Sequence, residues 1–228
     1  IYFFNALSQP EEIETLKNRL ETKKTGSSSI SILEEFVSNE LKGLSTQDKL
    51  DLLEKVFALS SVQRNDQLKL FVGTNIAGLY SRAGKSDRTI EMYYEILPIA
   101  EKKEDFVSQA IINTGMGSEY FFLKSYEKAL IYFKKAYKIN DKHRDSSEVA
   151  GSINNIGTTY SRTGEVDSAL YYLNLGLNYF TALKDTSKLA QTLNNKGSLY
   201  HRQMGKTKEA LNFFEEALRL HLLTSNRY

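Results

Sequence analysis

The chain has 228 residues, of which 41% are hydrophobic and 25% are charged, as in an ordinary globular protein. Thirty basic residues against 28 acidic ones give a formal net charge of +2, which offers no reason to expect nucleic acid or an anionic membrane as a partner. Cysteine is absent, which excludes disulfides, thiol nucleophiles and cysteine metal sites, and no run of about eighteen apolar residues could span a bilayer.

The first twelve residues, "IYFFNALSQPEE", join an apolar, aromatic run to the small-x-small pattern Ala6-Leu7-Ser8. This pattern resembles the end of a secretory signal peptide cleaved after Ser8, so that residues 1–8 would be a signal-peptide remnant and the protein would be periplasmic. In the alternative interpretation the run packs onto the first helices and the protein is cytoplasmic. Because the chain starts with Ile1 rather than methionine, we also expect it to be a fragment of a longer protein.

Residues 9–69 predict a divergent group of helices. Only two prolines and no alternating Val/Ile-rich runs occur in the chain, which predicts an all-α protein. The expected elements are helices over Glu11–Lys24, Ser31–Lys42 and Thr46–Val62, a loop over Thr25–Ser29, and a helix N-cap near Ser45 or Thr46. Their spacing suits a degenerate repeat in front of the regular ones.

From Leu70 onward the sequence repeats itself every forty residues. The two clearest registers are a small residue and a tyrosine, at Ala77, Gly117, Gly157 and Gly197 and at Tyr80, Tyr120, Tyr160 and Tyr200. Registers that stay in phase are the signature of a helical repeat array. The segment therefore divides into four repeats, at about 70–109, 110–149, 150–189 and 190–228.

The second repeat carries the series small residue, aromatic, alanine, aromatic, alanine, at Gly117, Tyr120, Ala129, Phe133 and Ala136. This series resembles the tetratricopeptide repeat, and the resemblance extends from Leu70 to the end. It implies an all-α fold, a right-handed superhelix (α-solenoid) of antiparallel helix pairs. The forty-residue period exceeds the common 34 and is similar to that of kinesin light chains, bacterial peptide-pheromone receptors and the repeat regions that precede bacterial sensor kinases.

Glycines mark two kinds of position in the repeat. A small residue at Gly197 lets the neighbouring helix approach closely, because the same helix face holds the packing residues Ala190, Leu193 and Tyr200. The turn between paired helices, where a left-handed residue is needed, has a glycine in three repeats, at Gly84, Gly164 and Gly205. The second repeat has Lys124 there, so we expect its turn to differ.

The last helix carries leucines near its end, namely Leu218, Leu220, Leu222 and Leu223. Terminal repeats normally present a polar capping face. We therefore expect the chain to be truncated at Tyr228, with further repeats downstream.

The helix face opposite the glycine–tyrosine stripe is the predicted binding surface, because in this family it lines the concave groove. The candidate residues of this peptide-binding groove are Asn75, Arg82, Phe122, Asn155, Thr158, Arg162, Asn195, Ser198, His201 and Arg202. An asparagine amide can donate to and accept from a peptide backbone, arginine suits carboxylates, and Phe122 would supply an apolar pocket. In the alternative interpretation the asparagines bond to neighbouring repeats or water, and the arginines are only solvated.

The sequence offers no constellation for chemistry. Neither His143 nor His221 has a second ligand three or four residues away, so we expect no metal site, and His201 suits a polar binding role. The "GMG" at Gly115–Gly117 lies inside a predicted helix and is not a phosphate loop. We therefore expect no enzymatic activity and no cofactor. The balanced charge also argues against nucleic acid, although helical repeats can read RNA.

The function predicted from these features is non-catalytic recognition of a protein or peptide in the concave groove. The long repeats resemble the sensory or regulatory region of a bacterial signalling protein, with a kinase or DNA-binding domain downstream in the full-length chain. The alternative is a free-standing adaptor that scaffolds the assembly of a protein complex.

Overall fold

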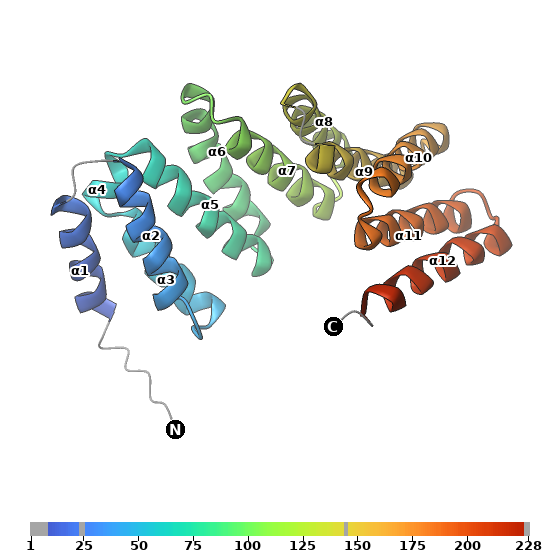
Figure 1. The fold of residues 1–228 in the computed structure, drawn as a ribbon. Helices are drawn as coiled ribbons and strands as arrows, with labels where there is room; N and C mark the ends of the chain where they lie inside the picture. Colours follow the sequence, from blue (N-terminus) through green and yellow to red (C-terminus); the bar gives the residue numbers. More distant parts are fainter. Residues whose placement is uncertain (1–8, 23–25, 144–145, 226–228) are drawn as a thin grey trace. The chain divides into compact units, whose positions relative to one another are not determined.

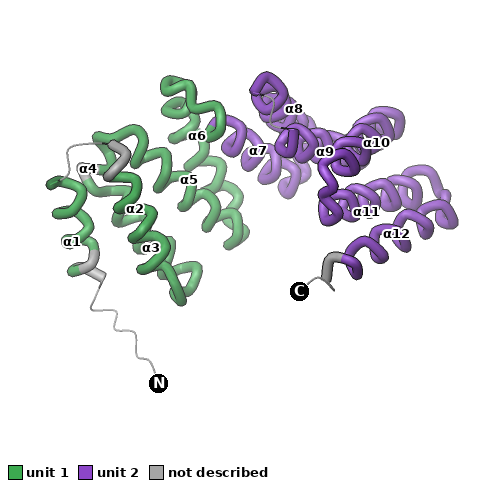
Figure 2. The backbone as a smooth tube through the Cα atoms, viewed as in Figure 1, with its two compact units in different colours: residues 1–108 green, residues 109–228 purple. Residues whose placement is uncertain are grey.

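A computed structural model describes residues 9–22, 26–143 and 146–225, and every regular element within these ranges is helical (Figure 1). The chain forms two compact units, residues 1–108 and 109–228 (Figure 2). The predicted signal-peptide remnant and its cleavage after Ser8 lie outside the described residues. The helices of the first unit are α1 (Gln9–Thr22), α2 (Gly26–Glu40), α3 (Thr46–Phe57), α4 (Ser60–Gln63), α5 (Asp66–Arg82) and α6 (Ser86–Lys102).

The first unit is built around one continuous apolar core. Helices α1, α2, α3 and α5 each bury leucine, isoleucine or valine side chains in it, among them Leu16, Leu33, Leu53 and Ile76. Helix α3 begins as predicted, because the Ser45 side chain accepts a hydrogen bond from the Asp48 backbone N–H at 3.2 Å and so caps the first turn.

Two predicted boundaries in this unit are wrong. The expected loop over Thr25–Ser29 is helical from Gly26 onward, because burial of Ile32, Leu33 and Phe36 stabilises α2 and tertiary packing overrides the weak helix propensity of the serine-rich stretch. The expected helix over Thr46–Val62 ends at Phe57, where the Leu59 N–H bonds to the Val56 carbonyl at 3.1 Å and tightens the chain into a turn before the short α4.

The second unit consists of three helix pairs. Its helices are α7 (Phe106–Phe122), α8 (Tyr126–Lys142), α9 (Ser146–Thr163), α10 (Val166–Leu183), α11 (Thr186–Arg202) and α12 (Thr207–Ser225). Within each pair the two helices run antiparallel and pack side by side, as Figure 1 shows for α11 and α12. This is the all-α, α-solenoid architecture of antiparallel helix pairs expected from the repeat.

Close approach of the paired helices explains the glycine register. A Cβ atom on Gly117 would lie 2.6 Å from Cδ1 and Cε1 of Phe133, which is itself buried. A Cβ on Gly157 would lie 3.0 Å from the backbone nitrogen of Leu173. Both distances are shorter than an ordinary carbon contact, so the helices are spaced for a hydrogen atom at these positions.

The turn of the second repeat does not differ from the others, contrary to the expectation from Lys124. Lys124 adopts a left-handed φ of 59°, close to the 69° of Gly84 and the 65° of Gly205. The Ser125 N–H bonds to the Tyr120 carbonyl at 2.8 Å, as the Lys85 N–H does to Tyr80 at 2.9 Å. The hydrogen bonds of this helix-ending motif hold the turn even where a lysine must adopt the strained conformation.

Candidate peptide-binding groove

The first helix of each pair carries the residues expected to bind a ligand. Helix α5 supplies Asn75 and Arg82, α7 ends with Phe122, and α9 and α11 supply the remainder. The three asparagines are half-buried, whereas Phe122 is 72% exposed. Their side chains are therefore accessible from one face of the helices rather than enclosed in the core.

Five of the expected residues meet in one cavity of about 250 Å³ in the second unit. They are Thr158, Arg162, Asn195, Ser198 and Arg202, and they come from the facing helices α9 and α11. Three further lining residues were missed, namely Tyr126, Ser161 and Gln203. Tyr126 opens α8 and Gln203 follows the last residue of α11, so neither lies on the helix stripe from which the groove was predicted.

Asn195 links the two helices. Its Nδ2 donates to Thr158 Oγ1 at 3.0 Å and to Asn154 Oδ1 at 3.4 Å, and Thr158 Oγ1 in turn donates to its own helix at the Asn154 carbonyl at 2.8 Å. Both amide protons of Asn195 are therefore engaged between neighbouring repeats, as the alternative interpretation of the sequence proposed. These bonds leave Oδ1 of Asn195 as the group that could accept a hydrogen bond from a ligand.

The two arginines give the cavity its charge. No acidic side chain lines it, and within the described residues neither Arg162 nor Arg202 forms an ion pair. The guanidinium carbon of Arg162 lies 5.9 Å from the centre of the Phe121 ring, a cation–π distance. Phe121 also packs edge-on against Tyr126, 5.5 Å between ring centres, so the aromatic residues position this arginine from the side of α7 and α8.

Other expected residues lie outside this cavity. His201 is exposed, and its Nδ1 lies 3.2 Å from Thr207 Oγ1 near the start of α12. Asn155 is half-buried on α9 and does not line the cavity. In the first unit, Asn75 Nδ2 donates to the Phe71 carbonyl one turn earlier on α5 at 2.9 Å, so this amide is turned partly toward its own helix.

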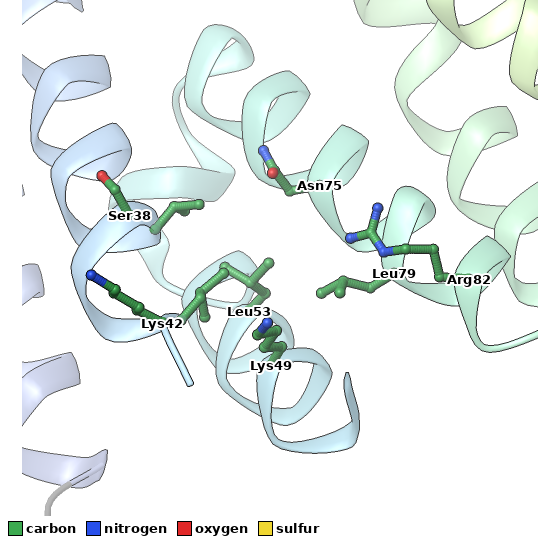
Figure 3. A pocket seen from close by; sticks show the side chains of 9 residues that line it. Ser38, Lys42, Lys49, Leu53, Asn75, Leu79 and Arg82 are labelled. Atoms are coloured by element: carbon green, nitrogen blue, oxygen red, sulfur yellow. The ribbon is translucent and has the colours of Figure 1, made fainter. Parts of the chain in front are cut away.

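Asn75 and Arg82 line a separate cavity of about 310 Å³ in the first unit (Figure 3). Residues of α2, α3 and α5 line it together with Leu41 and Lys42, which follow the end of α2, and the hollow is open to solvent. This cavity was not foreseen, because the residues contributed by α2 and α3 lie in the segment where no regular repeat was recognised.

Two other kinds of feature were sought, namely metal-ligand clusters and membrane-spanning helices. Within residues 9–22, 26–143 and 146–225 no three histidine or acidic side chains converge as metal ligands would. None of the helices that the structure describes is both long enough and apolar enough to cross a membrane.

Comparison with known proteins agrees with the repeat architecture. Family models described as tetratricopeptide repeat match residues 111–143 and residues 148–222. No curated protein matches the chain.

Several solved structures share its fold. BtubC (BKLC) of P. vanneervenii is 20% identical, with a TM-score of 0.72 over 96% of this chain and 90% of its own. The nearly identical TPR-like repeats of a Podosopora anserina protein described as a kinesin light chain are 15% identical, with a TM-score of 0.64 over 94% of this chain and 95% of their own. A Rap protein in complex with competence and sporulation factor is 13% identical, with a TM-score of 0.61 over 97% of this chain and 73% of its own. At these identities the similarity establishes the fold alone.

Proposed function

Since the chain belongs to the tetratricopeptide repeat family, whose repeats form protein-interaction modules, we propose that it binds an extended peptide or the tail of a partner protein along the first helices of its repeats. The observation that carries the proposal is the cavity between α9 and α11, which brings together five expected residues, two of them arginines that form no ion pair within the described residues. A guanidinium with no internal partner is available for bidentate bonding to a carboxylate of the ligand.

The role proposed for the asparagines follows from their hydrogen bonds. Asn195 is held by Thr158 and Asn154, so its Oδ1 is positioned in advance to accept a backbone N–H from the ligand. A positioned acceptor costs less conformational entropy on binding than a free side chain does. Asn75 and Asn155 would extend this clamp, and Phe122 would contribute an exposed apolar surface beside it.

The test begins with peptides selected from a displayed random library against the whole chain. Their affinities are then measured for wild type, for Arg162→Gln/Arg202→Gln, and for Lys138→Gln/Lys208→Gln, which removes two exposed charges outside the cavity. We expect the arginine variant to bind about tenfold more weakly or worse, since hydrogen bonds to charged groups contribute about 1.5–3 kcal/mol each. Equal affinities of the two variants, or no selected peptide at all, would refute the proposal.

A second measurement addresses the clamp itself. We expect Asn75→Ala/Asn155→Ala/Asn195→Ala to abolish peptide binding while the circular dichroism spectrum stays helical. Unchanged affinity would exclude the asparagines as ligand contacts.

The biological setting proposed for this module is the sensory or regulatory region of a bacterial signalling protein. The support is the fold shared with a Rap protein that was solved with competence and sporulation factor bound. A free-standing adaptor is the alternative. Sequencing the coding region on both sides distinguishes them, since a downstream kinase or DNA-binding domain favours the sensor, and a start codon before Ile1 with a polar capping helix after Tyr228 favours the adaptor.

A further inference from the structure

Helix α8 is strongly basic, although the chain as a whole is nearly neutral. The helix carries five lysines against two acidic residues. The second helices of the other repeats differ, because basic and acidic residues number two and four in α6, none and one in α10, and two and three in α12. The formal net charge of +2 for the whole chain therefore conceals an excess of positive charge on this one helix.

Four of these lysines form a stripe along the exposed side of α8, namely Lys128, Lys135, Lys138 and Lys142. Their spacings of seven, three and four residues place them on one side of the helix, over a length of about 21 Å. Within the part of the chain that the structure describes, Lys128, Lys135 and Lys138 form no ion pair. Lys128 and Lys135 each lie over a tyrosine ring, 5.2 and 5.1 Å from its centre, which leaves their positive charge available to a partner that carries negative charge.

Packing of the repeats does not require these lysines. Forty residues later, the corresponding positions of α10 hold uncharged residues, namely Ser168, Leu175, Asn178 and Ala182. Helix α10 nevertheless packs in its repeat as the second helix of a pair, as α8 does. An exposed stripe of charge that the repeat register does not dictate indicates a task other than packing.

Two exposed apolar side chains accompany the stripe. Ile131 lies between Lys128 and Lys135 on the same side of α8 and is 54% exposed. Tyr171 occupies the same register position forty residues later, on α10, and is 63% exposed. Because an isoleucine in the middle of a row of cations gains nothing from contact with a charged group, the partner should also offer apolar surface.

Helices α8 and α10 belong to the same unit, and both pack on α9 (Figure 1). Lys134 Nζ of α8 donates a hydrogen bond to the Tyr160 hydroxyl of α9 at 2.7 Å, and Tyr160 stacks on Tyr172 of α10 with ring centres 5.7 Å apart. Tyr172 in turn meets Tyr171 edge-on at 5.2 Å. Burial raises the pKa of Tyr137 on α8, and tyrosine hydroxyls of α10 raise it further, so the tyrosines of the two helices lie close together.

An anionic lipid bilayer offers both kinds of contact. Lysines near a charged leaflet are attracted to its headgroups, while isoleucine and tyrosine side chains enter the boundary between headgroups and acyl chains. A nucleic acid fits less well, because its phosphates would follow cations from repeat to repeat, whereas α10 carries no basic residue and α12 carries more acidic than basic ones. Helix α10 would repel a bilayer little, since Asp167 in its first turn is its one acidic residue.

The outer face of α8 and α10 consists of Lys128, Ile131, Lys135, Lys138, Lys142 and Tyr171. We propose that this outer face docks on the surface of an anionic lipid bilayer, where the lysines contact headgroups and the two apolar side chains enter the interface. None of these residues lines either cavity, so docking on a bilayer is independent of peptide binding and goes beyond the proposed function.

The probe is a large unilamellar vesicle of phosphatidylcholine with about 30% phosphatidylserine, sedimented with the full chain and compared with vesicles of phosphatidylcholine alone. We expect the chain to sediment with the anionic vesicles only. Lys135→Gln/Lys138→Gln should lower the partition coefficient about 25-fold, since each lysine near the surface contributes about fivefold. The control Lys188→Gln/Lys208→Gln removes the same charge from exposed positions of α11 and α12 and should lower the partition coefficient less than about threefold.

A second variant separates a bilayer from a soluble polyanion. Ile131→Ser/Tyr171→Ser leaves the charge unchanged and should lower the partition coefficient about tenfold, because two apolar side chains no longer enter the interface. A single-stranded oligothymidylate at equal phosphate concentration should not displace the chain from the vesicles. Circular dichroism of each variant checks that it folds.

Three results would overturn the proposal. Absence of sedimentation with anionic vesicles would show that the outer face does not bind a bilayer. Equal weakening by the lysine variant and by its control would mean that only the net charge matters. An unchanged partition coefficient for Ile131→Ser/Tyr171→Ser, or displacement by the oligothymidylate, would assign the lysine stripe to a soluble polyanion such as a nucleic acid.

Discussion

Replacing Gly157 with alanine tests whether helix spacing in the second unit is set by contact at this glycine. The added Cβ would lie 3.0 Å from the Leu173 backbone nitrogen, 3.1 Å from Leu173 Cγ and 3.1 Å from Tyr172 Cβ. Optimal separations are about 3.5–4.0 Å. The backbone atom cannot rotate away as a side chain would, so relief requires movement of α10 against α9.

Two opposing effects set the magnitude. Alanine is favoured over glycine in a helix interior by about 1 kcal/mol, whereas overpacking a well-packed core costs about 1–3 kcal/mol. The same helix offers a control, because a Cβ on Gly151 would meet nothing within 4 Å. Gly151→Ala should therefore stabilise by about 1 kcal/mol. The difference between the two variants isolates the packing cost of about 1–3 kcal/mol, since the helix-propensity gain is common to both.

The assay is thermal and urea denaturation of the full chain, followed by circular dichroism. At about 2–4 °C per kcal/mol for a chain of this size, Gly157→Ala should melt about 2–12 °C below Gly151→Ala. If the two variants were equally stabilised, the contact at Gly157 would not limit helix approach, and the physical reason given for the glycine register would be refuted.

Three further changes test other features. Burial of the Tyr80 hydroxyl, its hydrogen bond to Glu54 and the charge of Glu54 raise its pKa from 10.0 to about 12. The folded state thus keeps this proton at a pH where the unfolded state has lost it, so the stabilisation present below pH 10 should disappear between pH 10 and 12. The measurement is the pH profile of the denaturation midpoint for wild type and for Tyr80→Phe. Parallel profiles of the two proteins would contradict this expectation. Lys124→Gly should stabilise the protein by about 0.5–1 kcal/mol in urea denaturation, because it removes the cost of a left-handed φ of 59°. Gly164→Lys should destabilise the protein by about 1 kcal/mol, because lysine would have to adopt a φ of 84°. If neither variant changed the free energy of unfolding, these turns would be unstrained. Asn195→Ala should destabilise the protein by about 1–2 kcal/mol, because it removes two hydrogen bonds between repeats. The control Asn155→Ala, outside the cavity, should change the free energy of unfolding by no more than about 0.5 kcal/mol. Equal urea midpoints of the two variants would show that Asn195 does not link the repeats.

The repeat register predicted the helix pairs and their close contacts well, because each register position has a fixed structural task. Tyr120 and Tyr160 illustrate this: each stacks on a tyrosine of the paired helix, with ring centres 5.4 Å and 5.7 Å apart. The residue type at position 124 did not predict the turn, because the hydrogen bonds of the turn outweigh the preference of lysine for a negative φ. The residue types around Gly26 also gave a wrong prediction, because α2 starts inside a stretch that had been predicted as a loop.

The candidate site was predictable only in part. Helix geometry places Thr158 and Arg162 on one face of α9 and Asn195 on the corresponding face of α11, and the three side chains line one cavity. Bonding of the asparagines to neighbouring repeats was one of two interpretations of the sequence, but sequence spacing does not say which side chain is the partner, so Asn154 and Thr158 were not identified as partners of Asn195. The cavity of the first unit escaped prediction because α2 and α3, which line it together with α5, lie in the segment where no regular repeat was recognised.

The contacts at Gly117 and Gly157 also determine how far the repeats can be interchanged. A Cβ added to Gly117 would meet the ring of Phe133 at 2.6 Å, whereas a Cβ added to Gly157 would meet the backbone nitrogen of Leu173 at 3.0 Å. Each pair is thus matched to its own spacing. A hybrid array that combined α9 with α8, or α7 with α10, would set each glycine against a side chain other than the one it contacts here, so the unit for recombination in protein engineering is the intact helix pair.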